Sequence, residues 1–304
     1  MGVDRAGIAL RYSVFSPLEM AAVTDLSDKS AETNYVFIPD GRTGYEALEI
    51  AASLLGRTHR IHVGTGVIRI GEHDPMMLAR RLETLQAFSG NRCFLGIGTG
   101  SPGPNPRASI GLMLDRLQQF KVNLERLQAG IASPEVWIAA LRIPIARRVM
   151  DVADGLLLNF CSPSHVALVL DGLGPKKPKT LRLGCYLKVF FSAEGDDSAK
   201  RLLVQEFLNY DSIPQYHEMF LKDGVAQSLT RFRESGEWRT NTFDLPSELL
   251  RVSVANPSED ELRSYVKSFT RAGLQLPIIY PYFPTDEGQD TKIAIVRRVL
   301  ESVR

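Results

Sequence analysis

The sequence has few of the residues on which metal sites and disulfide-rich folds depend. Its only cysteines, Cys93, Cys161 and Cys185, are odd in number and far apart along the chain. This pattern excludes a disulfide framework and the spacings of zinc sites, so we expect reduced thiols in the core. The five histidines show no ligand spacing either, and we therefore expect no metal site.

Neither an excess of one charge nor a long apolar run is present. The 36 basic and 35 acidic residues leave a formal net charge of +1, and without a basic run nucleic acid is not indicated as a partner. No apolar run approaches the roughly 18 residues of a membrane span. The first residues, MGVDRAGIAL, lack the basic segment and apolar stretch of a secretory signal. We expect a cytoplasmic protein with no membrane partner.

The chain has the composition and length of one globular domain. Hydrophobic residues make up 44% and charged residues 23% of the 304 residues, which is an ordinary globular balance. The length would allow two domains, but α/β barrels of roughly 250 residues are single domains. We therefore predict one domain over residues 1–304.

Apolar segments typical of buried strands alternate with helical segments along the chain. The predicted strands are 7–10, 35–39, 61–68, 93–100, 135–141, 155–160, 181–192 and 276–280. The predicted helices are 18–33, 45–55, 76–88, 109–127, 145–153, 164–173, 257–273 and 292–303. Such alternation implies parallel strands joined by crossover helices. Eight units predict an α/β fold, a single (β/α)8 TIM barrel, with an open doubly wound sheet as the alternative.

One long region, 196–250, interrupts this alternation after the seventh strand. It is polar and helical in character, and it contains several aromatic residues. No shift in composition marks it as a second domain. We predict that it is an insertion that forms an amphipathic helical lid.

The segment 61–100 carries the most informative pattern. It contains the glycine motifs GTG and GIGTG at the ends of two predicted strands. Glycine there lets a planar ligand approach the backbone closely, or else serves tight packing inside the barrel. A dinucleotide fingerprint is a weaker interpretation of GIGTG, because Pro102, Pro104 and Pro106 indicate a loop where that motif needs a helix.

The order of several motifs resembles that of a known family. GTGV at 64–67, HDPMMLARRLETLQAFSGNR at 73–92 and LGIGTG at 95–100 follow one another, and WIAALRIPIARRVMDVADGLLLN at 137–159 and ANPSEDEL at 255–262 agree with the second half. These segments resemble the bacterial-luciferase-like monooxygenase superfamily. The most similar branch uses the deazaflavin coenzyme F420, as in methylene-tetrahydromethanopterin reductases. The resemblance implies a flavin-like redox cofactor at the carboxyl ends of the strands.

The resemblance also implies which residues contact that cofactor. Gly66 and Val67 match the place where related proteins carry a non-proline cis peptide beneath the cofactor ring. The other matching positions are the strand-four end, Gly98, Thr99, Gly100 and Ser101, and the loop after strand five, Ala139, Ala140, Leu141 and Arg142. In relatives that loop holds the cofactor phosphate. The next helix, which we expect to start near Pro144, and the charge of Arg142 would both favour an anion.

Familiar acid and base groups of the family are missing from this chain. Ser101 stands where several related dehydrogenases have a catalytic glutamate, and Ala9 stands where the pterin reductases have an acidic residue. Asp40 is then the best remaining carboxylate, because it follows a strand end, where barrel chemistry is located. Its alternative role is to cap a loop.

Three further polar residues follow strand ends and can reach the same face of the barrel. Arg11 follows strand one and joins Asp40 as a candidate catalytic residue. Tyr12, beside it, and Asn159, which ends strand six, are candidates for contact with a substrate. For Arg142, in the loop after strand five, a solvated surface arginine is the alternative.

The resemblance implies an oxidoreductase that transfers a hydride between reduced coenzyme F420 and a small organic substrate. Two alternatives remain open: an FMN-dependent monooxygenase of the same fold, and a flavin-binding protein that has lost catalysis. The family further implies a homodimer or a higher homo-oligomer.

Overall fold

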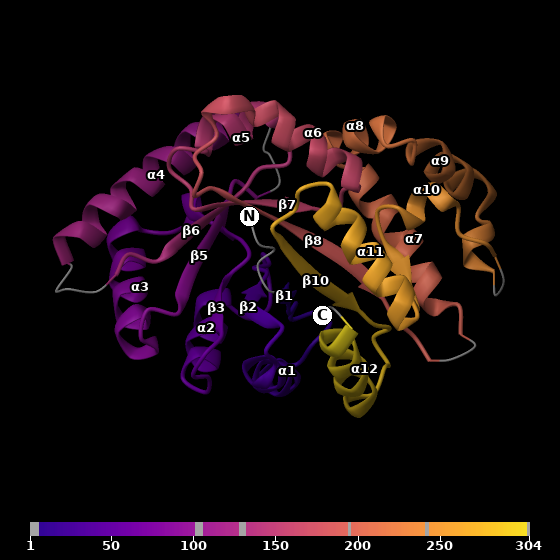
Figure 1. Cartoon of the computed structure of the whole chain (residues 1–304), viewed down its shortest axis with the longest axis horizontal. Coiled ribbons are helices and arrows are strands. Elements are labelled where there is room, and N and C mark those ends of the chain that lie inside the picture. The colour runs from indigo at the N-terminus through magenta and orange to yellow at the C-terminus, as the bar shows by residue number, and fades with distance from the viewer. Residues whose placement is uncertain (1–5, 101–105, 128–131, 194–195, 241–242, 303–304) are drawn as a thin grey trace.

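Eight parallel strands close into a barrel in the computed structural model, which describes residues 6–100, 106–127, 132–193, 196–240 and 243–302. The barrel strands are β1 (Ala6–Ala9), β2 (Thr33–Ile38), β3 (His62–Thr65) with β4 (Ile68–Arg69), β5 (Cys93–Gly98), β6 (Glu135–Ala139), β7 (Gly155–Asn159), β8 (Arg182–Phe190) and β10 (Leu276–Tyr282). β10 pairs with both β8 and β1, which closes the sheet. The predicted (β/α)8 barrel is confirmed (Figure 1), and the open sheet is excluded.

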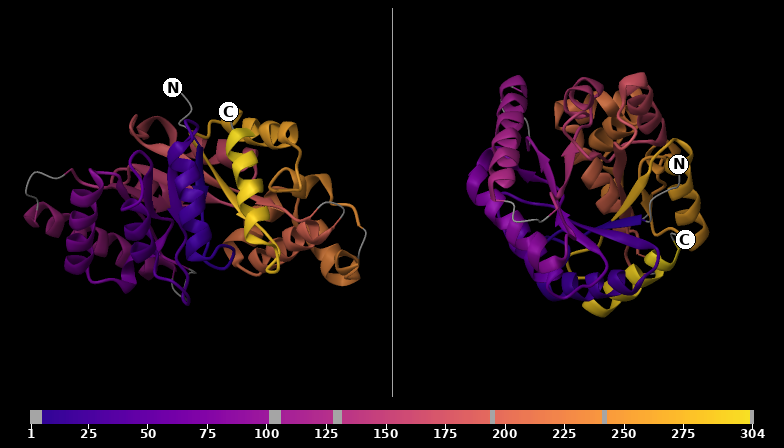
Figure 2. Two further views of the ribbon diagram at one scale, coloured as in Figure 1. Left: turned by 90° about the horizontal axis from the view of Figure 1, so that it is seen from below. Right: turned by 60° about the vertical axis from the view of Figure 1, so that its left-hand side comes forward.

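Helices surround the strands, as the crossover connections of a parallel sheet require. They are α1 (Pro17–Lys29), α2 (Ala47–Leu55), α3 (Pro75–Ser89), α4 (Pro106–Leu127), α5 (Ile143–Val149), α6 (Pro163–Leu173), α11 (Glu259–Arg271) and α12 (Gln289–Ser302). Local sequence explains several starts: Ser16 and Ser258 form capping boxes before α1 and α11, and Asp74 caps α3. The first and last helices, α1 and α12, lie side by side where the ring closes (Figure 2).

The 196–250 region is helical, as predicted. It contains α7 (Ser198–Asp211), α8 (Pro214–Lys222), α9 (Ala226–Ser235) and the short α10 (Ser247–Leu250). These helices gather on one side of the barrel, at the right of Figure 1. A two-residue strand that was not predicted, β9 (Val254–Ala255), follows them and pairs with the end of β8 outside the barrel.

The prediction that the first helix extends to residue 33 was wrong. α1 ends at Lys29, and Thr33 already belongs to β2. The Arg60 guanidinium donates to the carbonyl oxygens of Ser27 and Thr33, each at 2.7 Å, and also to that of Ser30. This distant arginine binds the carbonyls at the end of the helix, where helical hydrogen bonding stops. The helix propensities of residues 18–33 give no sign of this contact with Arg60.

The predicted strand 61–68 is interrupted rather than continuous. β3 pairs with β2 and β5, and β4 pairs with β5 alone. Between β3 and β4 lies the Gly66–Val67 peptide bond, which is cis, as the family resemblance led us to expect. The predicted strands 93–100 and 135–141 also end earlier, at Gly98 and Ala139, so the residues that follow them belong to loops at the barrel mouth.

Aromatic side chains fill the lower barrel. The rings of Phe37 and Phe94 lie 4.6 Å apart, and Phe37 meets Trp137 edge to face at 5.9 Å. Below them, at the amino ends of the strands, Arg182 pairs with Glu135 at 2.6 Å and stacks over Trp137 at 4.8 Å. This aromatic layer and ion pair form a plug that closes the lower end of the barrel.

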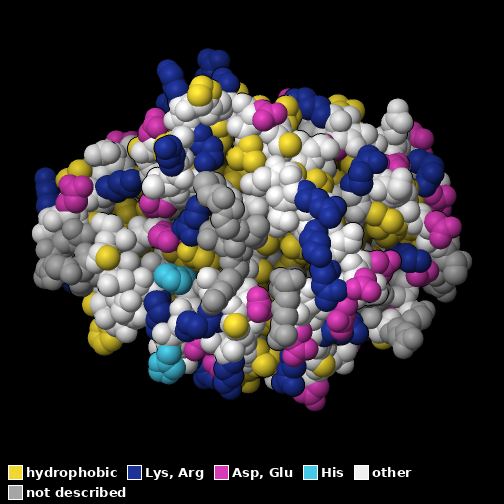
Figure 3. All heavy atoms as spheres, viewed as in Figure 1, with side chains coloured by type: hydrophobic (Ala, Val, Ile, Leu, Met, Phe, Trp, Pro, Cys, Tyr) yellow, Lys and Arg dark blue, Asp and Glu magenta, His cyan; other side chains and the backbone are white. Residues whose placement is uncertain are grey.

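The outer surface carries a mixture of charges. Acidic and basic side chains are interspersed over the face drawn in Figure 3, in keeping with the near-zero net charge. Within the part of the chain that the structure describes, no helix is both long and apolar enough to cross a membrane.

Candidate active site

A cavity of about 550 Å³ opens at the carboxyl ends of the barrel strands. This volume is within the range of small-molecule and cofactor sites. Its lining includes all the sequence-predicted site residues that the structure describes: Arg11, Tyr12, Asp40, Gly66, Val67, Gly98, Thr99, Gly100, Ala139, Ala140, Leu141, Arg142 and Asn159. Ser101 lies outside the described residues. Residues far apart in the sequence therefore meet at one place.

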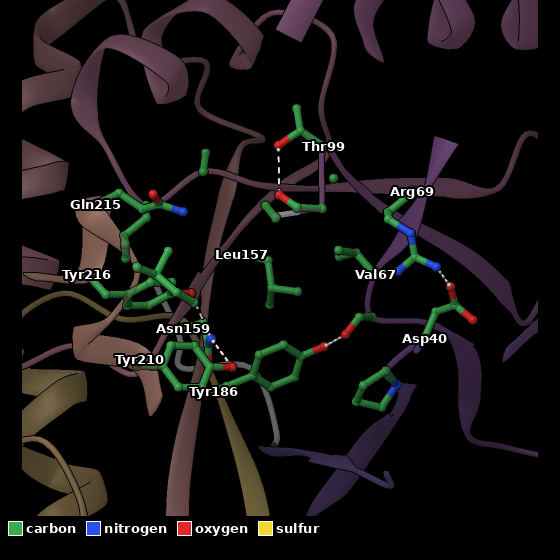
Figure 4. Close-up of a pocket in the computed structure, with 18 of the residues that line it drawn as sticks. Asp40, Val67, Arg69, Thr99, Leu157, Asn159, Tyr186, Tyr210, Gln215 and Tyr216 are labelled. Carbon is green, nitrogen blue, oxygen red and sulfur yellow. Dashed lines mark hydrogen bonds and ion pairs between the residues drawn. The ribbon is translucent and has the colours of Figure 1, made fainter. Parts of the chain in front are cut away.

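Small and apolar groups form the floor of the cavity. The side chains of Val67 and Leu157 point into its centre (Figure 4). A Cβ atom on Gly66 would lie 2.0 Å from the hydroxyl of Tyr186, and one on Gly98 would lie 2.9 Å from Cγ2 of Val67. The protein's own packing thus requires both glycines. Tyr186 also donates to the carbonyl oxygen of Gly66 at 2.7 Å, which holds the floor in place.

Asp40 forms an ion pair in the cavity wall with a residue that the sequence analysis missed. Its carboxylate lies 3.2 Å from Arg69, which also donates to the carbonyl oxygen of Gly41 at 3.0 Å. The stem of Arg69 crosses Gly100, which has a φ of 71°, and a Cβ there would lie 2.5 Å from Cδ of Arg69. Burial raises the pKa of Asp40, and this effect outweighs the opposing attraction of Arg69.

The loop after β6 differs from the expected anion site in one respect. α5 begins at Ile143, near the predicted start, but few of its amide groups are free. Pro144 has no N–H group, and the N–H groups of Ile145 and Ala146 both donate to the carbonyl oxygen of Arg142, each at 3.0 Å. Among the described residues, the exposed Arg142 side chain has no hydrogen-bond or ion-pair partner. Positive charge at this loop therefore comes from Arg142 rather than from the helix end.

A buried charged group, which we call the Lys188 cluster, lies beside the cavity and was also missed. It consists of Lys188 on β8, Glu206 on α7, Tyr282 on β10 and Arg11 after β1. The Lys188 ammonium lies 2.5 Å from the Glu206 carboxylate, and the lysine side chain has no exposed surface. Tyr282 donates to the same carboxylate oxygen at 2.7 Å, and Arg11 approaches it to 4.0 Å.

Contacts within the Lys188 cluster shift the pKa values of Glu206 and Arg11 so that both side chains stay charged. Burial alone would raise the pKa of Glu206, but Lys188, the Tyr282 hydroxyl and Arg11 together hold this pKa below its ordinary value. For Arg11, burial opposes the charge, yet Tyr280, Tyr282 and Glu206 raise its pKa. Arg11 is therefore a fixed positive charge at the cavity and cannot accept a proton.

Two tyrosines from the helical insertion complete the wall opposite Asp40. The amide nitrogen of Asn159 lies 3.2 Å from the hydroxyl of Tyr210 and 2.8 Å from that of Tyr216. Figure 4 shows these residues across the cavity from Val67 and Arg69. The sequence analysis had placed Asn159 at the site but had treated both tyrosines only as part of the lid.

Sequence comparison supports the resemblance noted above. A family model described as luciferase-like monooxygenase matches residues 31–125. The luciferase-like resemblance is confirmed. A sequence relative, the 4-hydroxyprotoasukamycin monooxygenase of Streptomyces nodosus subsp. asukaensis, is 44% identical over 50 residues. That match spans 16% of this chain and only 14% of the relative.

Solved structures share the fold over the whole chain. A coenzyme F420-dependent tetrahydromethanopterin reductase from Methanopyrus kandleri has a TM-score of 0.72 at 15% identity, covering 100% of this chain and 99% of its own. An F420-dependent secondary alcohol dehydrogenase, bound to an F420-acetone adduct, has a TM-score of 0.76 at 12% identity, covering 100% of both chains. The FMN-bound oxygenating constituent of 3,6-diketocamphane monooxygenase from Pseudomonas putida has a TM-score of 0.62 at 14% identity, covering 100% and 98%.

Proposed function

We propose that the protein is an oxidoreductase that transfers a hydride between reduced coenzyme F420 and an organic substrate. The observation that carries the proposal is the shape and charge of the cavity at the barrel mouth. An apolar floor, formed around Val67 and Leu157, suits an aromatic ring, and the exposed Arg142 suits a phosphate. The likeness to two F420-dependent structures supports the deazaflavin.

The residues present fit such a cofactor. Gly66, Val67, Gly98 and Leu157 would hold the ring, and the loop from Ala139 to Arg142 would hold the phosphate end. Once bound, a deazaflavin supplies the hydride chemistry, and the protein supplies position and environment. The apolar floor and the insertion helices would shield a bound ring from water.

Two predicted candidates in the cavity lining would have different roles. Asp40 can hold or release a proton at its carboxyl group, and its raised pKa brings the protonated form closer to neutral pH. Arg11 contributes a fixed positive charge that attracts electron-rich groups of a substrate. Neither role requires the acidic residue that Ala9 replaces.

An FMN-dependent monooxygenase is the second candidate. The family model carries the monooxygenase description, and the FMN-bound structure shares the fold. Both cofactors have a tricyclic ring and a phosphate, so the same cavity suits either one.

Anaerobic titration of the purified protein with reduced F420 and with FMN tests the proposal. We expect reduced F420 to bind in the micromolar range or tighter, about −8 kcal/mol, and to be oxidised when an accepted substrate is added. Tight FMN binding with oxygen consumption, and no binding of F420, would establish the monooxygenase instead. Binding without turnover across a substrate panel would indicate a cofactor-binding protein.

A further inference from the structure

One part of the cavity wall has more hydrogen-bond donors than acceptors. It consists of Asn159, Tyr210 and Tyr216, and we call it the tyrosine pair site. The Asn159 amide donates both of its N–H groups, one to each phenol oxygen, at 3.2 Å and 2.8 Å. A hydroxyl that accepts a hydrogen bond still has its own proton to donate. In the part of the chain that the structure describes, neither hydroxyl has an acceptor for that proton. Two O–H donors therefore remain available at the cavity wall.

The tyrosine pair site is built rigidly. The rings of Tyr210 and Tyr216 meet edge to face with centroids 4.6 Å apart at 83°. The ammonium of Lys188 lies 3.9 Å from the Tyr210 ring centroid and fixes the ring from below. A third polar atom, Oδ1 of Asn159, is buried and has no partner. Buried polar atoms are nearly always satisfied, so this acceptor requires a hydrogen-bond donor that the described residues do not supply.

Burial raises the pKa of Tyr216 well above its ordinary value, and the hydrogen bond from Asn159 offsets only part of that rise. The phenol therefore stays neutral at physiological pH and can donate a proton in a hydrogen bond. The Lys188 ammonium is neutralised by Glu206 at 2.5 Å, so the pair site offers neutral donors rather than a free positive charge. Neutral donors suit a neutral oxygen acceptor better than a carboxylate or a phosphate.

We propose that the hydroxyls of Tyr210 and Tyr216 together bind the carbonyl oxygen of the substrate. Both phenol oxygens lie within 3.2 Å of one nitrogen, and both tyrosines line the cavity, so the two hydroxyls belong to the same part of the cavity wall. The substrate class is then a ketone, an aldehyde or an unsaturated carbonyl compound. Two fixed donors polarise the carbonyl and stabilise the negative charge that its oxygen gains when a hydride reaches the carbon. The inference rests on the proposed function, because the substrate must share this cavity with the cofactor.

The test measures binding of 4-nitrophenolate, whose negative oxygen imitates the activated carbonyl and whose absorbance reports hydrogen bonding. The variants are Tyr210→Phe, Tyr216→Phe and the double variant, which remove only hydroxyl groups. The matched control is Tyr45→Phe, because Tyr45 is 54% exposed and lies outside the cavity lining. We expect each single variant to weaken binding about tenfold, the double variant more, and the control not at all.

A second probe keeps the inference falsifiable if a variant is less stable. Cyclohexanone labelled with ¹³C at the carbonyl should show a downfield shift of that carbon on binding to the wild type, and none in the double variant. Equal 4-nitrophenolate affinity in the wild type and the double variant, or an unshifted carbonyl carbon in the wild type, would overturn the inference.

Both probes are applied with and without cofactor, which separates the two proposals. If the wild type binds its cofactor normally, but 4-nitrophenolate binds equally well to the wild type and the double variant, only the tyrosine pair site is rejected. A wild type that binds neither F420 nor FMN, yet binds 4-nitrophenolate through the two hydroxyls, rejects the proposed function alone.

Discussion

The ammonium of Lys188 lies 2.5 Å from the carboxylate of Glu206, and the lysine side chain has no contact with solvent. Lys188 extends from a barrel strand, whereas Glu206 comes from the first helix of the insertion. The pair therefore fastens the insertion to the barrel beside the cavity. The ring centroids of Phe160 and Tyr210 lie 4.3 Å and 3.9 Å from the ammonium and add cation–π attraction.

Replacing Glu206 by Gln should destabilise the protein by about 3–5 kcal/mol, because it leaves the buried Lys188 ammonium without a counter-ion. Denaturant unfolding followed by circular dichroism measures the change. The matched control is Glu218→Gln on α8, whose side chain is exposed and should change stability by less than about 0.5 kcal/mol. A double change, Lys188→Met with Glu206→Leu, removes both charges and should recover part of the loss. Equal stability of Glu206→Gln and its control would contradict the prediction.

The Lys188–Glu206 pair should also make the stability of the folded protein depend on pH. The pKa of Glu206 is lowered in the folded protein from its ordinary value of 4.5. A lowered carboxyl pKa contributes stability at pH values above 4.5, and this contribution is lost as pH falls through the folded pKa. We therefore expect the loss of stability below pH 4.5 to be smaller in Glu206→Gln than in the wild type. Parallel stability curves for the two proteins would be inconsistent with the pair.

Asp40 should respond to the loss of its cation. Arg69→Gln removes the charge 3.2 Å from the carboxylate, so the pKa of Asp40, already raised by burial, should rise further. Carboxyl ¹³C chemical shifts, followed by NMR through a pH titration, measure this directly. Arg80→Gln on the exposed face of α3 serves as the control and should leave Asp40 unchanged. An Asp40 pKa that is unchanged in Arg69→Gln would show that the two side chains do not pair in solution.

Arg142 should contribute to cofactor affinity through its side chain. Arg142→Ala should weaken binding by roughly 1–3 kcal/mol, the value of a hydrogen bond to a charged group. Arg148→Ala is the control, because Arg148 is exposed on α5, the short helix that follows Arg142, but lies outside the cavity lining. Titration with the cofactor that the wild type binds gives both affinities. Unchanged affinity in Arg142→Ala would remove Arg142 from the phosphate site.

The barrel could be predicted from the sequence because its signals are local. Apolar runs such as GLLLN, followed by helices that begin at caps such as Ser162, repeat along the chain. Element ends were less predictable where distant residues decide them. Arg60 ends α1 through carbonyl groups that precede it by about thirty positions, and no pattern within the helix records that contact.

Some residues of the candidate site could likewise be predicted from the sequence, and others could not. Residues at strand ends, such as Asp40 and Asn159, could be found because parallel strands bring their carboxyl ends together. Glu206, Tyr210 and Tyr216 lie in the insertion, whose place over the barrel depends on tertiary packing. Lys188 did carry a signal: a single lysine within the apolar run CYLKVFF must find a partner if the strand is buried.

The plug at the amino ends of the strands makes the cavity a blind one. Because Trp137 and the Arg182–Glu135 pair close the lower barrel, anything that enters must leave by the same opening. A group resting on Val67 and Leu157 can depart only after whatever lies between it and the mouth has gone. Two reactants would then bind in a compulsory order, with the deeper one first in and last out, and steady-state kinetics would follow an ordered sequential scheme rather than a random one.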